Sequence, residues 1–328
     1  MSTDESGPET SGSSGRRWLW RALQLGGTLA GFGYVALTVE LGEVWTAMGR
    51  IAPWAFAAAC GVTLANLALG AVRWRVLLAA YGAPKRPSIL RLTHVYWVGF
   101  FYNNFVPGGV GGDVVRGIVT RQSFGPRGTT ASMTVVLVER ALGLSGLLLV
   151  VSATYLVRPL PGTEDVLPYS ALGLAFAAAG VASVAMGRRL APHLPGKLGE
   201  IAASLPVIER AGPFVGALGL SLGTQGLVAI TGWLILASIT GGAVSLPDAL
   251  VLVPLAMAAT YFPLSVGGAG AREAAFKTLA PLALGIAEAD ATAASLLIWG
   301  TQATVAALGG LLQLVAPPTA EAAREEAA

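Results

Sequence analysis

Two glycine-rich motifs carry the residue types that could bind a phosphate group. Residues 105–116 read FVPGGVGGDVVR and residues 262–273 read FPLSVGGAGARE. Aligned on their prolines, both contain Pro-x-x-Val-Gly-Gly-x-x-x-Arg, and every shared position is displaced by 156 residues. Proline and paired glycines break helices, so each motif predicts the tip of a helical hairpin. A helix that starts there exposes backbone N–H groups and its positive dipole end, which favour phosphate.

Charged side chains accompany both motifs. Asp113 and Arg116 follow the predicted tip of the first motif, and Arg272 and Glu273 follow that of the second. An arginine fork suits phosphodiester oxygens, while the carboxylates could meet a cationic headgroup or carry a proton. The alternative is structural pairing, of Arg116 with Asp113 at i,i+3 spacing and of Arg272 with Glu139 or Glu273. Close helix packing would explain the glycines, but it would not explain the shared proline and arginine.

A further charged pair, Glu139 and Arg140, lies inside an apolar helix predicted over 129–157. Each charge at the centre of a membrane helix costs roughly 2.5–3.5 kcal/mol, so such residues usually face a polar interior. We expect them to face the same cavity as the motifs. Arg73 and Arg75 are predicted to anchor their helix at the cytoplasmic interface. The candidate substrate-binding residues are Asn103, Asn104, Pro107, Gly108, Gly109, Gly111, Gly112, Asp113, Arg116, Glu139, Arg140, Pro263, Ser265, Gly267, Gly268, Gly270, Arg272 and Glu273.

The composition predicts that these residues lie in a membrane. Only 12% of the 328 residues are charged and 54% are hydrophobic, against roughly 25% charged in soluble proteins. Long uncharged runs separate short charged islands, and most are near the roughly 20 residues that a membrane helix needs. Cys60 is the single cysteine, and the two histidines leave no cluster for a metal. We expect no cofactor and no catalytic residue.

The repeat and the Lys/Arg distribution together predict the topology. We expect an all-α polytopic membrane protein with an inverted-topology repeat, of about six full spans and two broken or re-entrant hairpins. The transmembrane domain should cover 18–315, with repeats at 18–157 and 166–315, between disordered tails at 1–17 and 316–328. The positive-inside rule places both termini in the cytoplasm. A cleaved signal peptide is the alternative for the first span, and a complete crossing by 92–112 is the alternative for the first hairpin.

The same residues resemble a known family. The segments NNFVPGGVGGDVVR (103–116), VVLVER (135–140) and FPLSVGGAGAREAAF (262–276) are similar to the lysylphosphatidylglycerol synthase transmembrane region, the flippase-like half of bacterial multiple peptide resistance factors. The resemblance covers about 18–315 and implies a lipid-translocating membrane domain. It implies that the charged residues of the motifs, with Glu139 and Arg140, carry the translocation. Because the chain ends shortly after 315, we expect no aminoacyl-transferase domain.

These observations favour a lipid flippase-like protein of the bacterial plasma membrane, which translocates a phospholipid or glycolipid headgroup. The alternative is a secondary transporter of a small solute or ion, with Glu139 or Asp113 as the coupling carboxylate. A membrane transferase that uses one of these carboxylates as a base is a third hypothesis. The expected partners are membrane lipids, with a separate lipid-modifying enzyme as a further candidate and no nucleic acid. The oligomeric state is left open.

Overall fold

The structure is a computed structural model that describes residues 39–105, 111–157, 167–196, 210–258 and 268–317, with a few scattered positions outside these ranges. The described residues form helices and connecting turns, and no strand is present among them. The helices are α2 (Leu41–Gly49), α3 (Pro53–Ala80), α4 (Ile89–Phe105), α5 (Gly111–Thr120), η1 (Arg121–Arg127), α6 (Gly128–Val157), α7 (Leu167–Leu190), η3 (Ala191–His193), α9 (Ala211–Ile239), α10 (Leu246–Ala258), α11 (Ala271–Leu284) and α12 (Glu288–Val315).

Four of the described helices, α3, α6, α9 and α12, are long and apolar enough to cross a membrane. They contain 28 to 30 residues each, which at 1.5 Å per residue exceeds the roughly 30 Å of a hydrocarbon core. The apolar part of α7 is shorter and covers Ser170–Met186. The prediction of an all-helical membrane protein is therefore confirmed. The predicted first span and both tails lie almost wholly outside the described residues.

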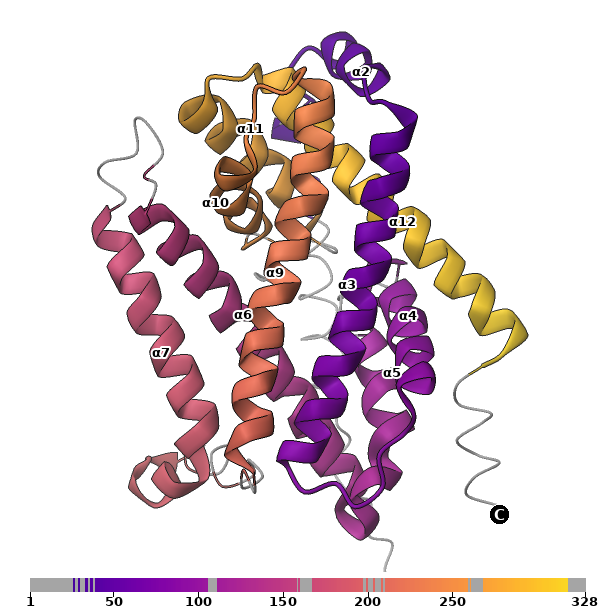
Figure 1. The fold of residues 1–328 in the computed structure, drawn as a ribbon, viewed down its shortest axis with the longest axis vertical. Helices are drawn as coiled ribbons and strands as arrows, with labels where there is room; N and C mark the ends of the chain where they lie inside the picture. The colour runs from indigo at the N-terminus through magenta and orange to yellow at the C-terminus, as the bar shows by residue number, and fades with distance from the viewer. Residues whose placement is uncertain are drawn as a thin grey trace, which may run out of the picture.

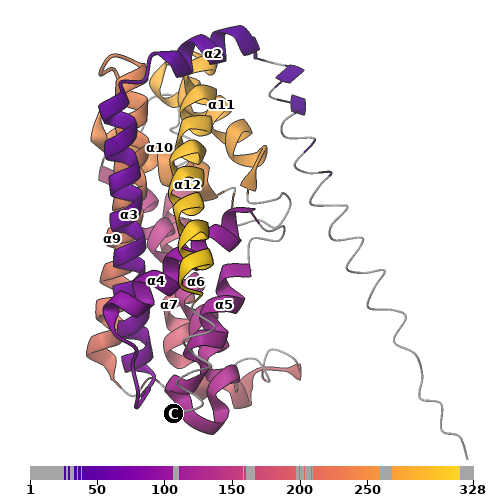
Figure 2. The same ribbon diagram turned by 90° about the vertical axis from the view of Figure 1, so that its right-hand side faces the viewer.

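The chain forms a helical hairpin at each motif. Helices α4 and α5 pack together in the lower half of the molecule, and α10 and α11 pack together in the upper half (Figures 1 and 2). In the second hairpin, Gly268 and Gly270 have φ values of 78° and 83°, a region that glycine adopts without strain. The predicted tip residues Pro107, Gly108, Gly109, Pro263, Ser265 and Gly267 lie outside the described residues.

The two halves of the chain have corresponding helices and corresponding contacts. Helices α9, α10, α11 and α12 follow the order of α3, α4, α5 and α6, and each begins 157 to 160 residues after its counterpart. Helix α4 packs against α12, and its counterpart α10 packs against α6. In Figure 1, α3 runs from the upper to the lower end, whereas α9 lies beside it and runs the opposite way. One hydrophobic core surrounds the first hairpin and another surrounds the second.

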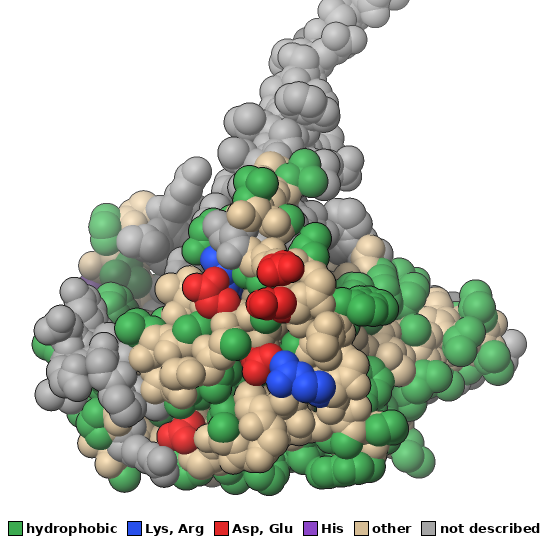
Figure 3. Space-filling model, turned by 90° about the horizontal axis from the view of Figure 1, so that it is seen from above, with side chains coloured by type: hydrophobic (Ala, Val, Ile, Leu, Met, Phe, Trp, Pro, Cys, Tyr) green, Lys and Arg blue, Asp and Glu red, His purple; other side chains and the backbone are tan. Residues whose placement is uncertain are grey.

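The two ends of the molecule differ in charge. At the lower end, the exposed charged side chains are all basic among the described residues: Lys85, Arg86, Arg188, Arg189 and Arg210. At the upper end, seen in Figure 3, acidic side chains predominate. Glu40, Glu43 and Glu288 are exposed there, and Asp290 forms an ion pair with Arg50. By the positive-inside rule, this asymmetry predicts that the lower end faces the cytoplasm.

The arrangement of the hairpins predicts a labelling pattern. In a Cys60→Ala background, Lys85→Cys precedes the first hairpin and Ala287→Cys follows the second, and both positions are exposed. A membrane-impermeant maleimide should label Ala287→Cys in intact cells but Lys85→Cys only after permeabilisation. The unsubstituted Cys60→Ala protein is the control for background. Labelling of both cysteines from one side would contradict hairpins that enter from opposite sides.

Candidate functional site

A cavity of about 370 Å³ lies where the first hairpin meets α3, α6 and α9. Six of the predicted residues line it: Asn103, Asn104, Asp113, Arg116, Glu139 and Arg140. Among the described residues of the second hairpin, Thr260, which follows α10, lines the cavity. The cavity is therefore built mainly by the first half of the chain, with α9 completing its wall.

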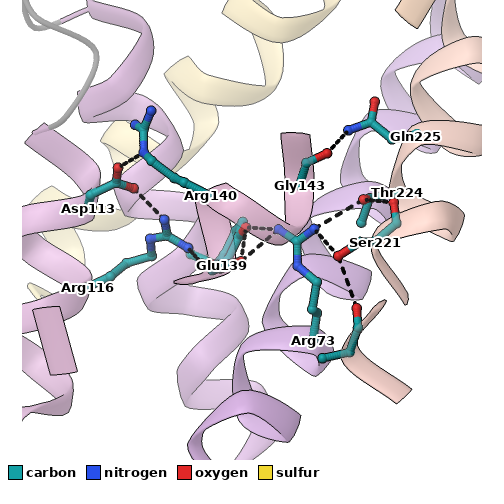
Figure 4. Close-up of polar contacts among 11 residues, drawn as sticks. Arg73, Asp113, Arg116, Glu139, Arg140, Gly143, Ser221, Thr224 and Gln225 are labelled. Atoms are coloured by element: carbon teal, nitrogen blue, oxygen red, sulfur yellow. Dashed lines mark hydrogen bonds and ion pairs between the residues drawn. The ribbon is translucent and has the colours of Figure 1, made fainter. Parts of the chain in front are cut away.

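Glu139 is the centre of the charged cluster in this cavity, and only 1% of it is exposed. Its Oε1 atom accepts hydrogen bonds of 2.8 Å from Arg73 Nη2 and from the Tyr96 hydroxyl. Its Oε2 atom accepts a hydrogen bond of 2.6 Å from Arg116 Nη1. The donors come from α3, α4 and α5, while Glu139 itself belongs to α6. One buried carboxylate thus joins four helices, and Figure 4 shows Glu139 beside Arg73 and Arg116.

Asp113 extends the cluster towards the surface. Its carboxylate forms ion pairs with Arg116 and with Arg140 (Figure 4). The Arg116 guanidinium also lies over the Tyr96 ring, 4.5 Å from its centroid, which adds a cation–π contact. Arg116 is buried, whereas 42% of the Arg140 side chain is exposed. The cluster contains three arginines and two carboxylates, so it carries one excess positive charge.

Arg73 is the first residue that the sequence prediction placed wrongly. It was predicted to anchor α3 at the interface, but it is only 8% exposed and lies in the cavity. Beyond Glu139, it donates to the hydroxyls of Ser221 and Thr224 on α9, at 3.2 and 3.3 Å. Arg75 faces away from the cavity, and its Nε atom donates to the carbonyl of Pro87 in the α3–α4 loop.

The glycines and asparagines of the first motif have structural contacts. A Cβ atom on Gly112 would collide with the backbone of Gly99, so the glycine lets α5 pack directly on α4. The side-chain carbonyl of Asn103 accepts a hydrogen bond of 2.8 Å from the Gly112 N–H and caps α5. Asn104 donates to the Phe100 carbonyl at 2.9 Å. The Gly112 N–H, one of the backbone groups predicted to bind phosphate, therefore already donates to a side chain of the protein.

The described residues of the second motif, from Gly268 to Glu273, are not among those that line the cavity. Arg272 and Glu273 are 2% and 0% exposed, and they form an ion pair with each other. Arg272 Nε also donates to Ser295 at 3.2 Å, and Glu273 accepts a hydrogen bond of 2.7 Å from the Gly270 N–H at the start of α11. These contacts match the pairing alternative for Arg272. The structure does not bring Arg116 and Arg272 to one substrate site.

Several cavity residues were not predicted from the sequence: Asn66, Arg73, Tyr96, Thr224 and Gln225. Arg73 had a usable signal, because it is an arginine inside a 28-residue apolar helix. Tyr96, Thr224 and Gln225 resemble ordinary polar residues of membrane helices, and the sequence offers no sign of the direction they face. Gln225 donates to the Gly143 carbonyl at 3.2 Å, which joins α9 to α6 beside the cavity.

Comparison with known families agrees with this architecture. The chain matches the family model of the lysylphosphatidylglycerol synthase TM region over residues 23–310. Because the match covers most of its length, the chain belongs to this family. The match includes both hairpins and every residue of the charged cluster. No curated protein sequence matches the chain at a significant level.

The cluster predicts a large effect of removing the Glu139 charge. Glu139→Gln would leave Arg73 and Arg116 facing each other without a shared counter-charge. Breaking a buried ion pair on one side costs about 3–5 kcal/mol, so the unfolding midpoint in detergent should fall clearly. Glu43→Gln, at an exposed position on α2, should leave the midpoint unchanged. A Glu139→Gln protein as stable as wild type would contradict the central role of this carboxylate.

The contact between α4 and α5 predicts a second effect on stability. Gly112→Ala should force the hairpin helices apart and lower the free energy of unfolding by about 1–3 kcal/mol, as overpacking does. Gly61→Ala is the matched control, because its added Cβ would meet no atom within 4 Å. Alanine favours a helix over glycine, so the control should be as stable as wild type or slightly more stable. Equal stability of the two variants would show that the close approach is unimportant.

Proposed function

We propose that the protein is a flippase-like lipid transporter that moves the polar headgroup of a phospholipid or glycolipid through the charged cavity. The observation that carries this proposal is a charged cavity of about 370 Å³, lined by the first hairpin and by α3, α6 and α9, which are long and apolar enough to cross a membrane. Its volume lies within the roughly 300–1,000 Å³ typical of ligand pockets. Ionisable groups inside membrane helices are costly, and they mark substrate and ion pathways. Membership of a lipid-related membrane family supports the same substrate class.

We propose further that the scaffold is an inverted-topology repeat. Two hairpins that point towards each other from opposite ends, and helices that follow the same order in opposite directions, support this assignment (Figure 1). Broken helices at corresponding positions of two inverted repeats form the substrate sites of many transporters. With the basic end in the cytoplasm, α12 ends on the cytoplasmic side. The predicted first span would place the N-terminus there too.

The exposed side of the cluster indicates how a headgroup could enter. Arg140 lies on the outer face of α6 between Leu137 and Leu144, which are 64% and 39% exposed. Val114 and Ile118 expose a similar apolar face on the neighbouring helix α5. Acyl chains could remain against these side chains while the headgroup passes Arg140 into the cavity. The excess positive charge of the cluster favours a headgroup that contains phosphate.

Transport of a small solute or ion on the same scaffold is the alternative, and a transferase is a further one. We propose a transporter rather than an enzyme, because the carboxylates of the cavity are engaged by arginines. Asp113 forms ion pairs with Arg116 and Arg140, and Glu139 with Arg73 and Arg116. The transport assay below separates lipid movement from solute movement.

The proposed route predicts that Arg140 controls the rate of lipid movement. The protein is reconstituted into liposomes with fluorescent phosphatidylglycerol, and accessibility of the fluorophore to an external quencher is followed. Arg140→Gln should slow translocation about tenfold, the equivalent of losing one charge-assisted hydrogen bond. Arg140→Lys should have an intermediate rate because it keeps the charge but loses the fork. Arg189→Gln, outside the cavity, is the control and should match wild type.

Three outcomes would count against these assignments. Wild-type liposomes that move lipid no faster than empty liposomes would reject the flippase proposal. Uptake of a charged solute without lipid movement would establish the alternative. A wild-type rate in Arg140→Gln would leave the proposed function intact but remove Arg140 from the route.

A further inference from the structure

Four uncharged amide side chains line the central cavity together with the charged cluster. They are Asn66 on α3, Asn103 and Asn104 at the end of α4, and Gln225 on α9. Helix α3 packs against both α4 and α9, so the amides come from helices that meet around one space. The cavity therefore has a neutral polar lining in addition to its ion pairs.

Each of these amides keeps a hydrogen-bonding atom that the described part of the chain does not use. The Oδ1 atom of Asn66 is buried, and no described residue donates a hydrogen bond to it. Gln225 and Asn104 each donate to a backbone carbonyl, at 3.2 and 2.9 Å, while their own side-chain oxygens accept no hydrogen bond from a described residue. Asn103 is the reverse, because its oxygen caps α5 and its NH₂ group is left to donate. The lining thus offers both acceptors and donors.

The carboxylates of the cavity, by contrast, are engaged by arginines. One phosphodiester would balance the single excess positive charge of the cluster. The sequence places no charged residue at 106–110 or 259–267, so the hairpin tips add no charge. An ammonium group in the same headgroup would therefore have no counter-charge, and an unpaired charge is far more costly to bury than a hydrogen-bonded hydroxyl. A hydroxyl both donates and accepts, which matches the amides.

We infer that the transported headgroup is a phosphate ester whose remaining part is an uncharged polyol, such as glycerol or a sugar. This inference rests on the proposed function and names its substrate class. Figure 4 shows Asp113 and Arg140 on one side of the cluster and Gln225 on the other. A headgroup that passes Arg140 therefore places its phosphate near the arginines and its hydroxyls against the amides. Asn66 is the main polyol contact, because its side-chain oxygen has no partner within the described protein.

Binding of headgroups without acyl chains tests this selectivity apart from transport. The full-length protein in detergent is titrated by calorimetry with glycerophosphoglycerol and with glycerophosphoethanolamine. The two molecules share the phosphodiester and differ in the hydroxyl-bearing or ammonium-bearing end. Wild type should bind glycerophosphoglycerol about tenfold more tightly, because its binding leaves no charge unpaired.

Substitutions of Asn66 separate recognition of the polyol from a structural role. Asn66→Leu should lower the affinity for glycerophosphoglycerol about fivefold, the loss of one hydrogen bond, and should change that for glycerophosphoethanolamine much less. Asn66→Asp should reverse the preference, because the new carboxylate gives the ammonium group a counter-charge. Gln302→Leu is the matched control, since it removes an amide from α12 outside the cavity and should retain both wild-type affinities.

The same titrations contain the results that would overturn the inference. Equal affinities of wild type for the two headgroups, or no binding of either, would show that the cavity does not select a polyol. An equal loss of both affinities in Asn66→Leu would identify a structural asparagine. No gain for glycerophosphoethanolamine in Asn66→Asp would contradict the charge balance on which the inference depends. A protein that keeps the binding preference but moves no lipid in liposomes would reject the proposed function alone.

Discussion

The first half of the structure depends on the ion pairs and the hydrogen bond that the buried carboxylate of Glu139 forms. A charge in a medium of low dielectric constant is retained only when ion pairs and hydrogen bonds replace its hydration. Arg73, Tyr96 and Arg116 provide that replacement from three helices. Because each donor must lie within hydrogen-bond distance of the same two oxygens, the cluster also determines how α3, α4, α5 and α6 approach one another. The cavity is the space left beside this arrangement.

The second half reaches a similar fold without such a cluster. The position that corresponds to Glu139, 156 residues later, is Ser295, and it binds Arg272 as Glu139 binds Arg116. Arg272 obtains its counter-charge from the adjacent Glu273, so no other helix has to supply one. The counterparts of the remaining cluster residues are apolar: Ala229 for Arg73, Leu252 for Tyr96, Ala269 for Asp113 and Leu296 for Arg140. Among the described residues, the two halves share the order of their helices, whereas the charged cluster lies in the first half alone.

Sequence reasoning predicted the parts that depend on local chemistry. The helix breaks, the intramembrane position of Glu139 and the Asp113–Arg116 pair follow from glycines, proline, charge cost and i,i+3 spacing. It could not predict which way a uniformly apolar helix faces. Arg73 and Arg75 are two positions apart, so they point about 200° apart on α3, and only one can face the cavity. Arg116 lines the cavity and Arg272 does not, because a repeated motif does not require that both copies keep the same partners.

The charge of the cluster constrains how transport could proceed on the proposed function. Glu139 and Asp113 already bind Arg73, Arg116 and Arg140, and the excess positive charge leaves room for one phosphate anion. Arg73 and Arg116 are buried on both sides of Glu139, so moving either would expose an unpaired carboxylate at several kcal/mol. Arg140 differs because its side chain is half-exposed and contacts the outermost carboxylate of the cluster. An entering phosphate can therefore compete with Asp113 for Arg140 while the contacts of Glu139 stay intact. The inner part of the cluster acts as a fixed scaffold, and the outer ion pair is the part that substrate can exchange.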